Sequence, residues 1–287
     1  MNYRQPSYTS RRDLLKRFVG GLAEVGATAA LWRCGFAVAN AEPLSTPITG
    51  LADCGRFAAG DVIDGDTLNL ADGSTLRLCG IEAPKDALAN GDPDVLNLAK
   101  QARAALAKLT VGRALRLYCD QAPFDRHRRR MAQVLGADGL WLQAEMLKLG
   151  LARVHGQADH RLGLREMLAV EADARRTGIG LWGAPAFALR RADDPDLGRF
   201  AGSFQIIAGR PLTAERKNDL GFVNFGPDRH ADLTLVLKNE ALKLSDAANI
   251  AIEGLSGRDI RCRGWLGLRD GPNIEITHPE QIEILES

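Results

Sequence analysis

Two neighbouring stretches, Val62-Ile63-Asp64-Gly65-Asp66-Thr67-Leu68 and Leu76-Arg77-Leu78-Cys79-Gly80-Ile81-Glu82-Ala83-Pro84, are the most informative part of this sequence. They overlap residues 56–81, where short β-like runs are separated by the turn sequences Asp64-Gly65 and Asp72-Gly73. This pattern predicts a meander of short strands. Taken alone, the acidic turn in the first stretch is also compatible with a simple hairpin.

The segment after this meander mixes helical and strand patterns. Pro93 could begin a helix whose apolar residues recur on one face through Leu109. Further elements are expected as a strand at 114–119, a hairpin of 131–135 with 140–141, a helix at 142–149 and a longer helix at 162–176.

From residue 204 onward the pattern changes to short strands separated by turns. We expect them at 204–207, 220–225, 231–237, 259–266, 273–276 and 281–285. Several short strands at this spacing predict a second, smaller β-barrel that is closed or partly closed.

Three motifs together resemble the thermonuclease (staphylococcal nuclease-like) family. They are the stretches at 62–68 and 76–84, then Asp125-Arg126-His127-Arg128-Arg129, and finally residues 171–176 with Gly180-Leu181-Trp182. The similarity covers residues 56–183 with the motifs in the family's order. It implies an α+β fold, an OB-type five-stranded barrel with three helices. It also implies hydrolysis of phosphodiester bonds in DNA or RNA with bound Ca²⁺.

The resemblance further implies which residues hold that cation. Asp66 would be a direct ligand, Glu82 would replace a second ligand that is usually Asp, and Ala83 would offer its backbone carbonyl. Asp64 would support the site from outside the ligand shell. Oxygen ligands suit a hard cation that orients the phosphate and the attacking water.

Arginines complete the implied site. Arg77 and Arg129 match the two arginines that hold the phosphate during catalysis, where planar guanidinium groups form paired hydrogen bonds. Arg126 and His127 fall near the position of the terminal phosphate, as substrate-binding residues in a looser match. The simpler interpretations are an edge-strand charge for Arg77 and a solvated basic loop for residues 126–130.

Lys85 departs from the family's pattern. The family has Glu at this position, which positions and activates the attacking water. An ammonium group accepts no hydrogen bonds, and its charge weakens the binding of a nearby cation. A substitute carboxylate could come from Asp86, Asp92 or Asp94.

Two hypotheses about function follow from this departure. The first is a Ca²⁺-dependent nuclease with a relocated base, favoured by the retained pattern of carboxylates and arginines. The second is a nucleic-acid or anion-binding module that has lost catalysis, favoured by Lys85. The first predicts metal-dependent strand breaks, and the second predicts salt-sensitive binding without them.

Residues 204–287 resemble the OB-like accessory domain found after some bacterial thermonuclease domains. OB barrels often stack bases on exposed aromatic rings beside basic side chains. Candidate side chains for such stacking are Trp265, Phe222 and Phe225 with Arg261, Arg263 and Arg269. The alternative is that the aromatic rings belong to the core and that His278 caps a turn.

The charge of the chain is distributed unevenly. The whole chain has 37 Lys and Arg against 36 Asp and Glu. Residues 1–41 contain six of the basic and two of the acidic residues, so residues 42–287 have a net charge of −3. Nucleic-acid binding therefore requires a local basic patch.

Four cysteines lie beyond residue 41. They are Cys54, Cys79, Cys119 and Cys262, and their wide spacing without a Cys-x-x-Cys pair argues against a zinc site. The sequence leaves buried free thiols and a single disulfide as equal alternatives.

Residues 1–41 are predicted to be a twin-arginine signal peptide. The stretch Ser10-Arg11-Arg12-Asp13-Leu14-Leu15-Lys16 resembles the export motif, and Ala39-Asn40-Ala41 offers small residues before a cleavage site. The alternative is an amphipathic cytosolic helix. Export predicts a bacterial periplasmic or secreted protein without stable membrane insertion after cleavage, and the oligomeric state stays open.

These patterns give a predicted division of the chain. It consists of a signal peptide at 1–41, a linker at 42–55, the thermonuclease-like domain at 56–188, a second linker at 189–203 and the OB-like accessory domain at 204–287.

Overall fold

The computed structural model describes residues 49–89, 91–120 and 122–285. The predicted signal peptide and the beginning of the first predicted linker lie outside these ranges. The described residues all fall within one compact unit, 42–287. The predicted thermonuclease-like and accessory regions are therefore parts of the same unit.

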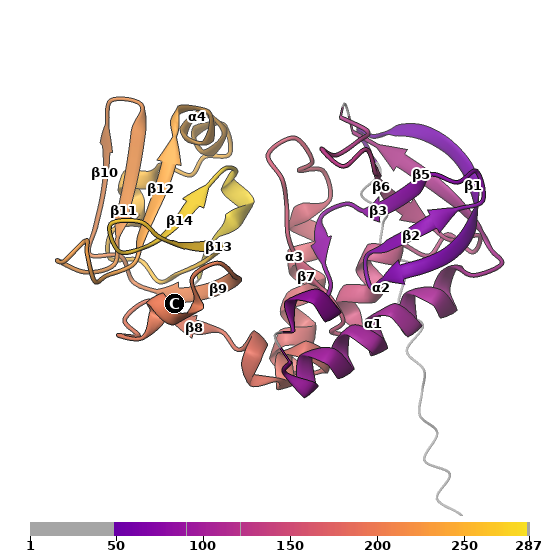
Figure 1. Ribbon diagram of the computed structural model, residues 1–287. Helices are drawn as coiled ribbons and strands as arrows, with labels where there is room; N and C mark the ends of the chain where they lie inside the picture. Colours follow the sequence, from indigo (N-terminus) through magenta and orange to yellow (C-terminus); the bar gives the residue numbers. More distant parts are fainter. Residues whose placement is uncertain (1–48, 90, 121, 286–287) are drawn as a thin grey trace, which may run out of the picture. The chain divides into compact units, whose positions relative to one another are not determined.

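Five strands close a barrel, as Figure 1 shows. Their order around the barrel is β1 (Ala52–Asp64), β2 (Thr67–Leu70), β3 (Thr75–Leu78), β6 (Arg130–Leu135) and β5 (Ala114–Cys119). Strand β1 pairs with both β2 and β5, and register shifts along it let one strand bend around the barrel. Only the β3–β6 pair among these five is parallel. The predicted five-stranded barrel is confirmed.

Leucines that alternate along the strands fill the barrel. Leu76 and Leu78 of β3 and Leu115 and Leu117 of β5 are fully buried, and burial of each such side chain contributes about 2 kcal/mol. Arg77, between the two leucines of β3, is also buried. Strand β3 is therefore covered on both faces, which predicts specific polar partners for Arg77.

Three α-helices accompany the barrel: α1 (Pro93–Thr110), α2 (Leu142–Lys148) and α3 (Leu164–Thr177). Asp92 caps α1 by accepting hydrogen bonds from two backbone N–H groups of its first turn. Gly178 ends α3 in the left-handed conformation, with φ of 67°. The three predicted helices are confirmed. No helix in the described ranges is long and apolar enough to cross a membrane.

A short two-stranded ladder positions the acidic end of the second motif. Strand β4 (Ile81–Glu82) pairs with β7 (Arg153–Val154), so Glu82 lies opposite Arg153. Short 3₁₀ helices occur at η1 (Asp86–Leu88), η2 (Gly180–Gly183), η3 (Pro185–Phe187), η4 (Leu197–Phe200), η5 (Ile252–Leu255) and η6 (Pro279–Gln281).

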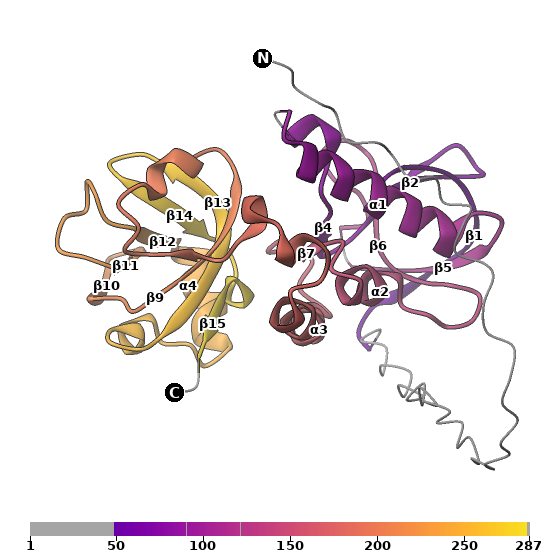
Figure 2. The same ribbon diagram turned by 90° about the horizontal axis from the view of Figure 1, so that it is seen from below.

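The C-terminal region forms a second, curled β-sheet with its own core, seen in Figure 2. The strand order is β10 (Thr213–Lys217), β11 (Leu220–Asn224), β12 (Thr234–Lys238), β14 (Pro272–Ile276), β13 (Ile260–Leu268), β9 (Phe204–Gly209) and β8 (Arg190–Arg191), with β15 (Ile282–Ile284) also beside β13. Helix α4 (Asn239–Ala247) follows β12. The predicted β-rich region is confirmed, while its OB-like character stays a prediction.

Both predicted linkers contain ordered elements. Strand β1 begins at Ala52, inside the range predicted as linker, because this end of β1 pairs with β5. The range 189–203 contains β8 and η4, with Ala192 and Leu197 buried in the second core. The stretch is rich in charged residues, so its composition did not indicate that two of its apolar residues are buried.

One disulfide and two buried thiols resolve the cysteine alternatives. Cys54 of β1 is bonded to Cys119 of β5, with 6.0 Å between their Cα atoms. Cys79 and Cys262 are buried free thiols, and burial raises the pKa of each to about 12. These two thiols therefore remain protonated and poorly reactive.

Candidate functional site

The acidic turn between β1 and β2 places two carboxylates beside each other. The Asp66 backbone N–H donates to Asp64 Oδ1 at 3.0 Å, which fixes the turn. A Cβ on Gly65 would lie 2.5 Å from Ala102 Cβ of α1 and 2.6 Å from Ala83 Cβ. Glycine is therefore required here because the turn lies directly against α1.

Asp66 is the buried centre of the site. Its side chain is fully buried, and it accepts hydrogen bonds from the Ala83 backbone N–H and the Thr67 hydroxyl, both at 2.8 Å. Burial opposes ionisation of Asp66, but the charges of Arg77 and Lys85 outweigh it and hold its pKa below the usual value. Asp66 is thus a carboxylate held by cationic partners.

Arg77 is bonded to carboxylates on both sides. Its Nη1 atom contacts Asp66 Oδ1, and Nη2 donates to Glu82 Oε2 at 2.5 Å. Nη2 also donates to the Ile81 carbonyl at 3.2 Å. Arg77 lines the neighbouring cavity, but both of its terminal nitrogens already have acidic partners. The predicted phosphate-binding role of Arg77 would require it to exchange those partners.

Lys85 points its ammonium group into the same carboxylate cluster. Its Nζ atom lies 3.0 Å from Asp64 Oδ2, and 2.8 and 2.9 Å from the two carboxylate oxygens of Asp66. Glu82 Oε1 is 3.9 Å away. Burial raises the pKa of Glu82 and the charge of Asp66 raises it further, against the opposite effects of Arg77 and Lys85.

These residues do not fit the Ca²⁺ ion that the family resemblance implies. The Lys85 ammonium occupies the space that Asp64, Asp66 and Glu82 surround, at hydrogen-bonding distances from the first two. The backbone N–H of Ala83, the residue expected to offer its carbonyl, is bonded to Asp66. Within the described ranges, no group of three or more His, Cys, Asp and Glu side chains is arranged to hold a metal ion.

The three carboxylates considered as substitutes for the missing Glu do not line the cavity that contains Arg77, although Asp92 lines the smaller cavity beside Lys85. Asp92 Oδ1 is bonded to the N–H groups of Asp94 and Val95 at 2.9 and 3.3 Å as the cap of α1. Asp86 and Asp94 are exposed on η1 and α1, and neither lines the cavity that contains Arg77 and Lys85. None of the three is therefore in position as a base beside Arg77.

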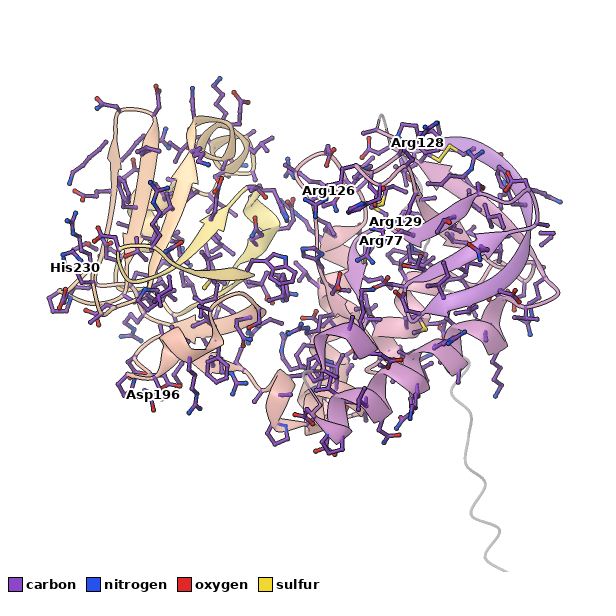
Figure 3. All side chains as sticks on the ribbon, viewed as in Figure 1. Arg77, Arg126, Arg128, Arg129, Asp196 and His230 are labelled. Atoms are coloured by element: carbon purple, nitrogen blue, oxygen red, sulfur yellow. A yellow bond between two sulfur atoms is a disulfide. The ribbon has the colours of Figure 1, made fainter. Side chains whose placement is uncertain are left out.

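The loop before β6 presents the second group of predicted residues. Asp125 accepts the backbone N–H groups of His127 and Arg129 at 2.9 Å each, and it binds the Arg129 guanidinium at 2.7–2.8 Å. The exposed Arg126 donates to His127 Nε2 at 3.1 Å. Arg77, Arg126 and Arg129 line one cavity, and Figure 3 shows their arrangement with that of Arg128.

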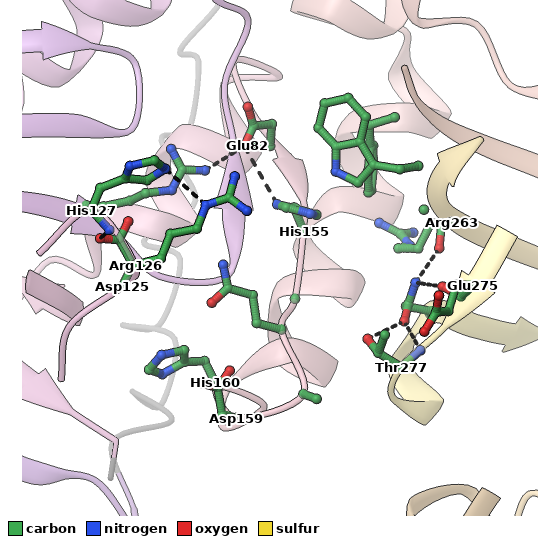
Figure 4. Close-up of a pocket in the computed structure, with 18 of the residues that line it drawn as sticks. Glu82, Asp125, Arg126, His127, His155, Asp159, His160, Arg263, Glu275 and Thr277 are labelled. Carbon is green, nitrogen blue, oxygen red and sulfur yellow. Dashed lines mark hydrogen bonds and ion pairs between the residues drawn. The ribbon is translucent and has the colours of Figure 1, made fainter. Parts of the chain in front are cut away.

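This cavity of about 810 Å³ is the largest feature of the site. Lys85, Arg126 and Arg129, from loops of the barrel domain, line it, and so do Phe204 and Trp265 of the second sheet. Figure 4 shows other lining residues, among them Glu82, His155 and Thr277. Trp265 is 47% exposed. A smaller cavity of about 400 Å³ shares Lys85, Phe204 and Trp265 with the first. The cavity therefore combines cationic groups with an accessible aromatic ring.

His155 is a cavity residue that the sequence did not single out. It follows β7, its Nδ1 atom is 3.6 Å from Glu82 Oε2, and its ring packs edge-on against Phe204 with 4.9 Å between centroids. Burial, together with the charges of Arg77 and Arg153, lowers the pKa of His155 to about 4. His155 lies outside the three motifs, so no sequence pattern indicated that it lines the cavity.

The second sheet contributes fewer exposed groups than the sequence suggested. Arg263 is 1% exposed and forms a buried pair with Glu171, while Arg261 binds Glu283 at 3.0 Å. Phe225 packs against the second core. Arg263 lines the cavity but is buried in its ion pair, and Trp265 is the aromatic residue of this group that lines the cavity.

Residues 75–184 match the family model described as Staphylococcal nuclease homologue. The match begins at β3 and includes Arg77, Glu82, Lys85 and Arg129. The chain thus contains a thermonuclease-like domain of OB type, and the match suggests a nuclease-type function for it. A search among curated proteins found no match.

Proposed function

We propose that this protein binds single-stranded nucleic acid in the 810 Å³ cavity, through phosphate groups and bases together. The observation that supports this proposal best is the lining of the cavity, which includes Arg126, Arg129 and the exposed Trp265 together with several acidic side chains. Cationic side chains offset the phosphate charges, and an aromatic face stacks on any base. Single strands are favoured because their bases are free to stack on protein side chains.

Each cationic group contributes differently. Within the described ranges Arg126 has one side-chain partner, His127, and its side chain is exposed, so binding a phosphate breaks few existing contacts. Arg129 is oriented by Asp125 and retains a side chain that is 29% exposed. A guanidinium held in this way is preorganised for a phosphate oxygen. Lys85 offsets part of the negative charge of Asp64 and Asp66 beside the cavity, so these carboxylates repel a phosphate less.

Hydrolysis of the bound strand is the second candidate function. The match of residues 75–184 to a nuclease family favours it, as does the position of Arg77 and Arg129 at one cavity. The carboxylate cluster favours binding without hydrolysis, because the Lys85 ammonium group lies where the family has a water-activating Glu. Catalytic roles for Arg77 and Arg129 and a role for Ca²⁺ belong to this second candidate.

The test is a binding titration of the full chain with a fluorescein-labelled oligothymidylate, followed by fluorescence anisotropy. The Arg126→Ala/Arg129→Ala variant removes two cavity charges. The control, Arg113→Ala/Arg176→Ala, removes two exposed charges that do not line the cavity. We expect affinity to fall by at least about tenfold in the first variant, with a salt dependence reduced by about two phosphate contacts.

The same samples are analysed on a denaturing gel with Ca²⁺ and with chelator. Binding without strand breaks under both conditions supports the proposed function. Strand breaks that need Ca²⁺ would replace it with the second candidate. Equal affinities of the cavity variant and its control would overturn the cavity as the binding site.

We further propose export by the twin-arginine route to the periplasm or the exterior. The support is the sequence of residues 1–41 and the Cys54–Cys119 disulfide, since disulfides persist in oxidising compartments. Cell fractionation tests this, with an Arg11→Lys/Arg12→Lys variant expected to stay in the cytoplasm.

A further inference from the structure

We propose that Lys85 is a built-in cation that occupies a latent divalent-metal site formed by Asp64, Asp66 and Glu82. The ammonium nitrogen lies within 3.0 Å of three oxygens from Asp64 and Asp66 and 3.9 Å from Glu82. An ammonium group donates three hydrogen bonds, and the three closest oxygens account for all of them. The site is therefore satisfied by the chain itself.

Charge supports the same assignment. Three carboxylates face two cationic side chains, Arg77 and Lys85, which leaves one uncompensated negative charge. Without Lys85 two negative charges would remain, the number that one divalent cation balances. Asp66 is fully buried, and without Lys85 it would keep Arg77 as its cationic partner, one cation fewer than in the native chain. Removal of Lys85 should therefore favour the binding of another cation at this position.

Geometry makes the ammonium and a metal ion mutually exclusive. The distances from Lys85 Nζ to the Asp64 and Asp66 oxygens are close to those of charge-assisted N–H···O hydrogen bonds. Ca²⁺ would lie closer, at about 2.3–2.6 Å from its oxygen ligands. Both cations would need the same Asp66 oxygens, and the Lys85 side chain is only 21% exposed. Binding of Ca²⁺ by the native chain would require expulsion of Lys85 into solvent.

The experiment is isothermal titration of CaCl₂ into the full chain and into Lys85→Met, which keeps the length of the side chain and removes its charge. Lys85→Arg retains the charge as the matched control. We expect Lys85→Met to bind one Ca²⁺ at least about tenfold more tightly than the native chain, from the loss of a nearby like charge. Lys85→Met/Asp66→Asn is expected to lose this binding.

A second readout is the midpoint of thermal unfolding, because a ligand that binds only the folded state raises it. CaCl₂ is expected to raise the midpoint of Lys85→Met and to leave the native chain and Lys85→Arg unchanged. Circular dichroism checks that each variant is folded. Should Lys85→Met fail to fold, Lys85→Ala and the native titration still decide the question.

Two results would overturn the inference. One is binding of Ca²⁺ by the native chain as tightly as by Lys85→Met, and the other is a folded Lys85→Met that does not bind Ca²⁺. The inference rests on the proposed function in one respect, which is the role of the carboxylate cluster and Lys85 in phosphate binding. The calcium titration contains no nucleic acid, so it can fail while oligonucleotide binding succeeds, and the reverse.

Discussion

Arg263 of β13 and Glu171 of α3 form a bidentate ion pair in which both N–O distances are 2.9 Å and both side chains are buried. Glu171 also accepts the backbone N–H of Val154 at 2.6 Å. Arg263 further binds Glu283 at 2.5 Å. The pair therefore joins a helix of the thermonuclease-like domain to the second sheet, next to the strand that precedes His155.

Breaking this pair on one side should destabilise the protein strongly. Arg263→Met leaves the buried Glu171 with Arg175 as its remaining cationic partner and removes a partner of Glu283, and we expect the free energy of unfolding to fall by about 3–5 kcal/mol. Urea unfolding measures this. Arg263→Met/Glu171→Gln, which keeps an acceptor for Val154, should recover part of the loss. The control is Arg176→Met, which breaks an exposed ion pair with Asp173 and should have little effect on stability. An equally small effect of Arg263→Met would contradict the prediction.

Loss of the Trp265 ring should weaken binding of single strands. Stacking of a base on an aromatic ring contributes about 1–3 kcal/mol, so Trp265→Ala should lower oligothymidylate affinity about 5- to 150-fold. Leu268→Ala is the matched control, because Leu268 is exposed on the same strand and does not line the cavity. Anisotropy titrations that give both variants the same affinity would exclude stacking on Trp265.

Stability should depend on the protonation of His155. Its pKa is about 4 in the folded chain and 6.5 in the reference state, so the unfolded chain binds the proton more readily. The contribution to stability is complete above pH 6.5 and is lost as the pH falls towards 4, by up to about 3 kcal/mol.

The comparison with His155→Phe isolates this effect from that of the carboxylates. Phe retains an aromatic ring against Phe204 and does not titrate. We expect the native chain to lose more free energy of unfolding than His155→Phe between pH 6.5 and pH 4. Parallel pH dependences of the two proteins would show that His155 does not contribute.

The Cys54–Cys119 disulfide should stabilise the barrel where β1 meets β5. The two cysteines are 65 residues apart, and chain-entropy arguments give about 4 kcal/mol for closing a loop of this length. Cys54→Ser/Cys119→Ser should therefore unfold at lower urea concentration than the oxidised native chain. Reductant should lower the stability of the native chain towards that of the variant and leave the variant unaffected. If reductant does not change the stability of the native chain, the prediction is wrong.

Much of the fold was predictable because periodicity and turn residues agree with each other. Pro93 and Asp92 at the start of α1, and Gly178 after α3, are local signals that the structure retains. Strand β10 was missed because its Glu215-Arg216-Lys217 segment is exposed and charged, without an apolar face that reveals a strand. Helix α4 was missed because it is short and buries only Ala241, Leu242 and Ser245, too few positions for a clear apolar face in the sequence.

The candidate site was predictable in its membership and not in its pairings. The motifs group Asp64, Asp66 and Glu82, and in the structure all three carboxylates lie within 4 Å of the Lys85 ammonium nitrogen. The sequence showed that Lys85 departs from the pattern but not where its flexible side chain ends. Contacts of long side chains, and partners from distant segments such as Arg263, depend on tertiary packing that no local pattern encodes.

A dissolved ion fills a carboxylate site only in proportion to its concentration, and a chelator empties the site by mass action. The Lys85 ammonium reaches Asp66 from the same polypeptide, 19 residues further along the chain. Its local concentration is set by the fold and not by the surrounding medium. Dilution and calcium scarcity therefore leave this position occupied, and the charge that the cavity presents stays constant across media that differ in their mineral content.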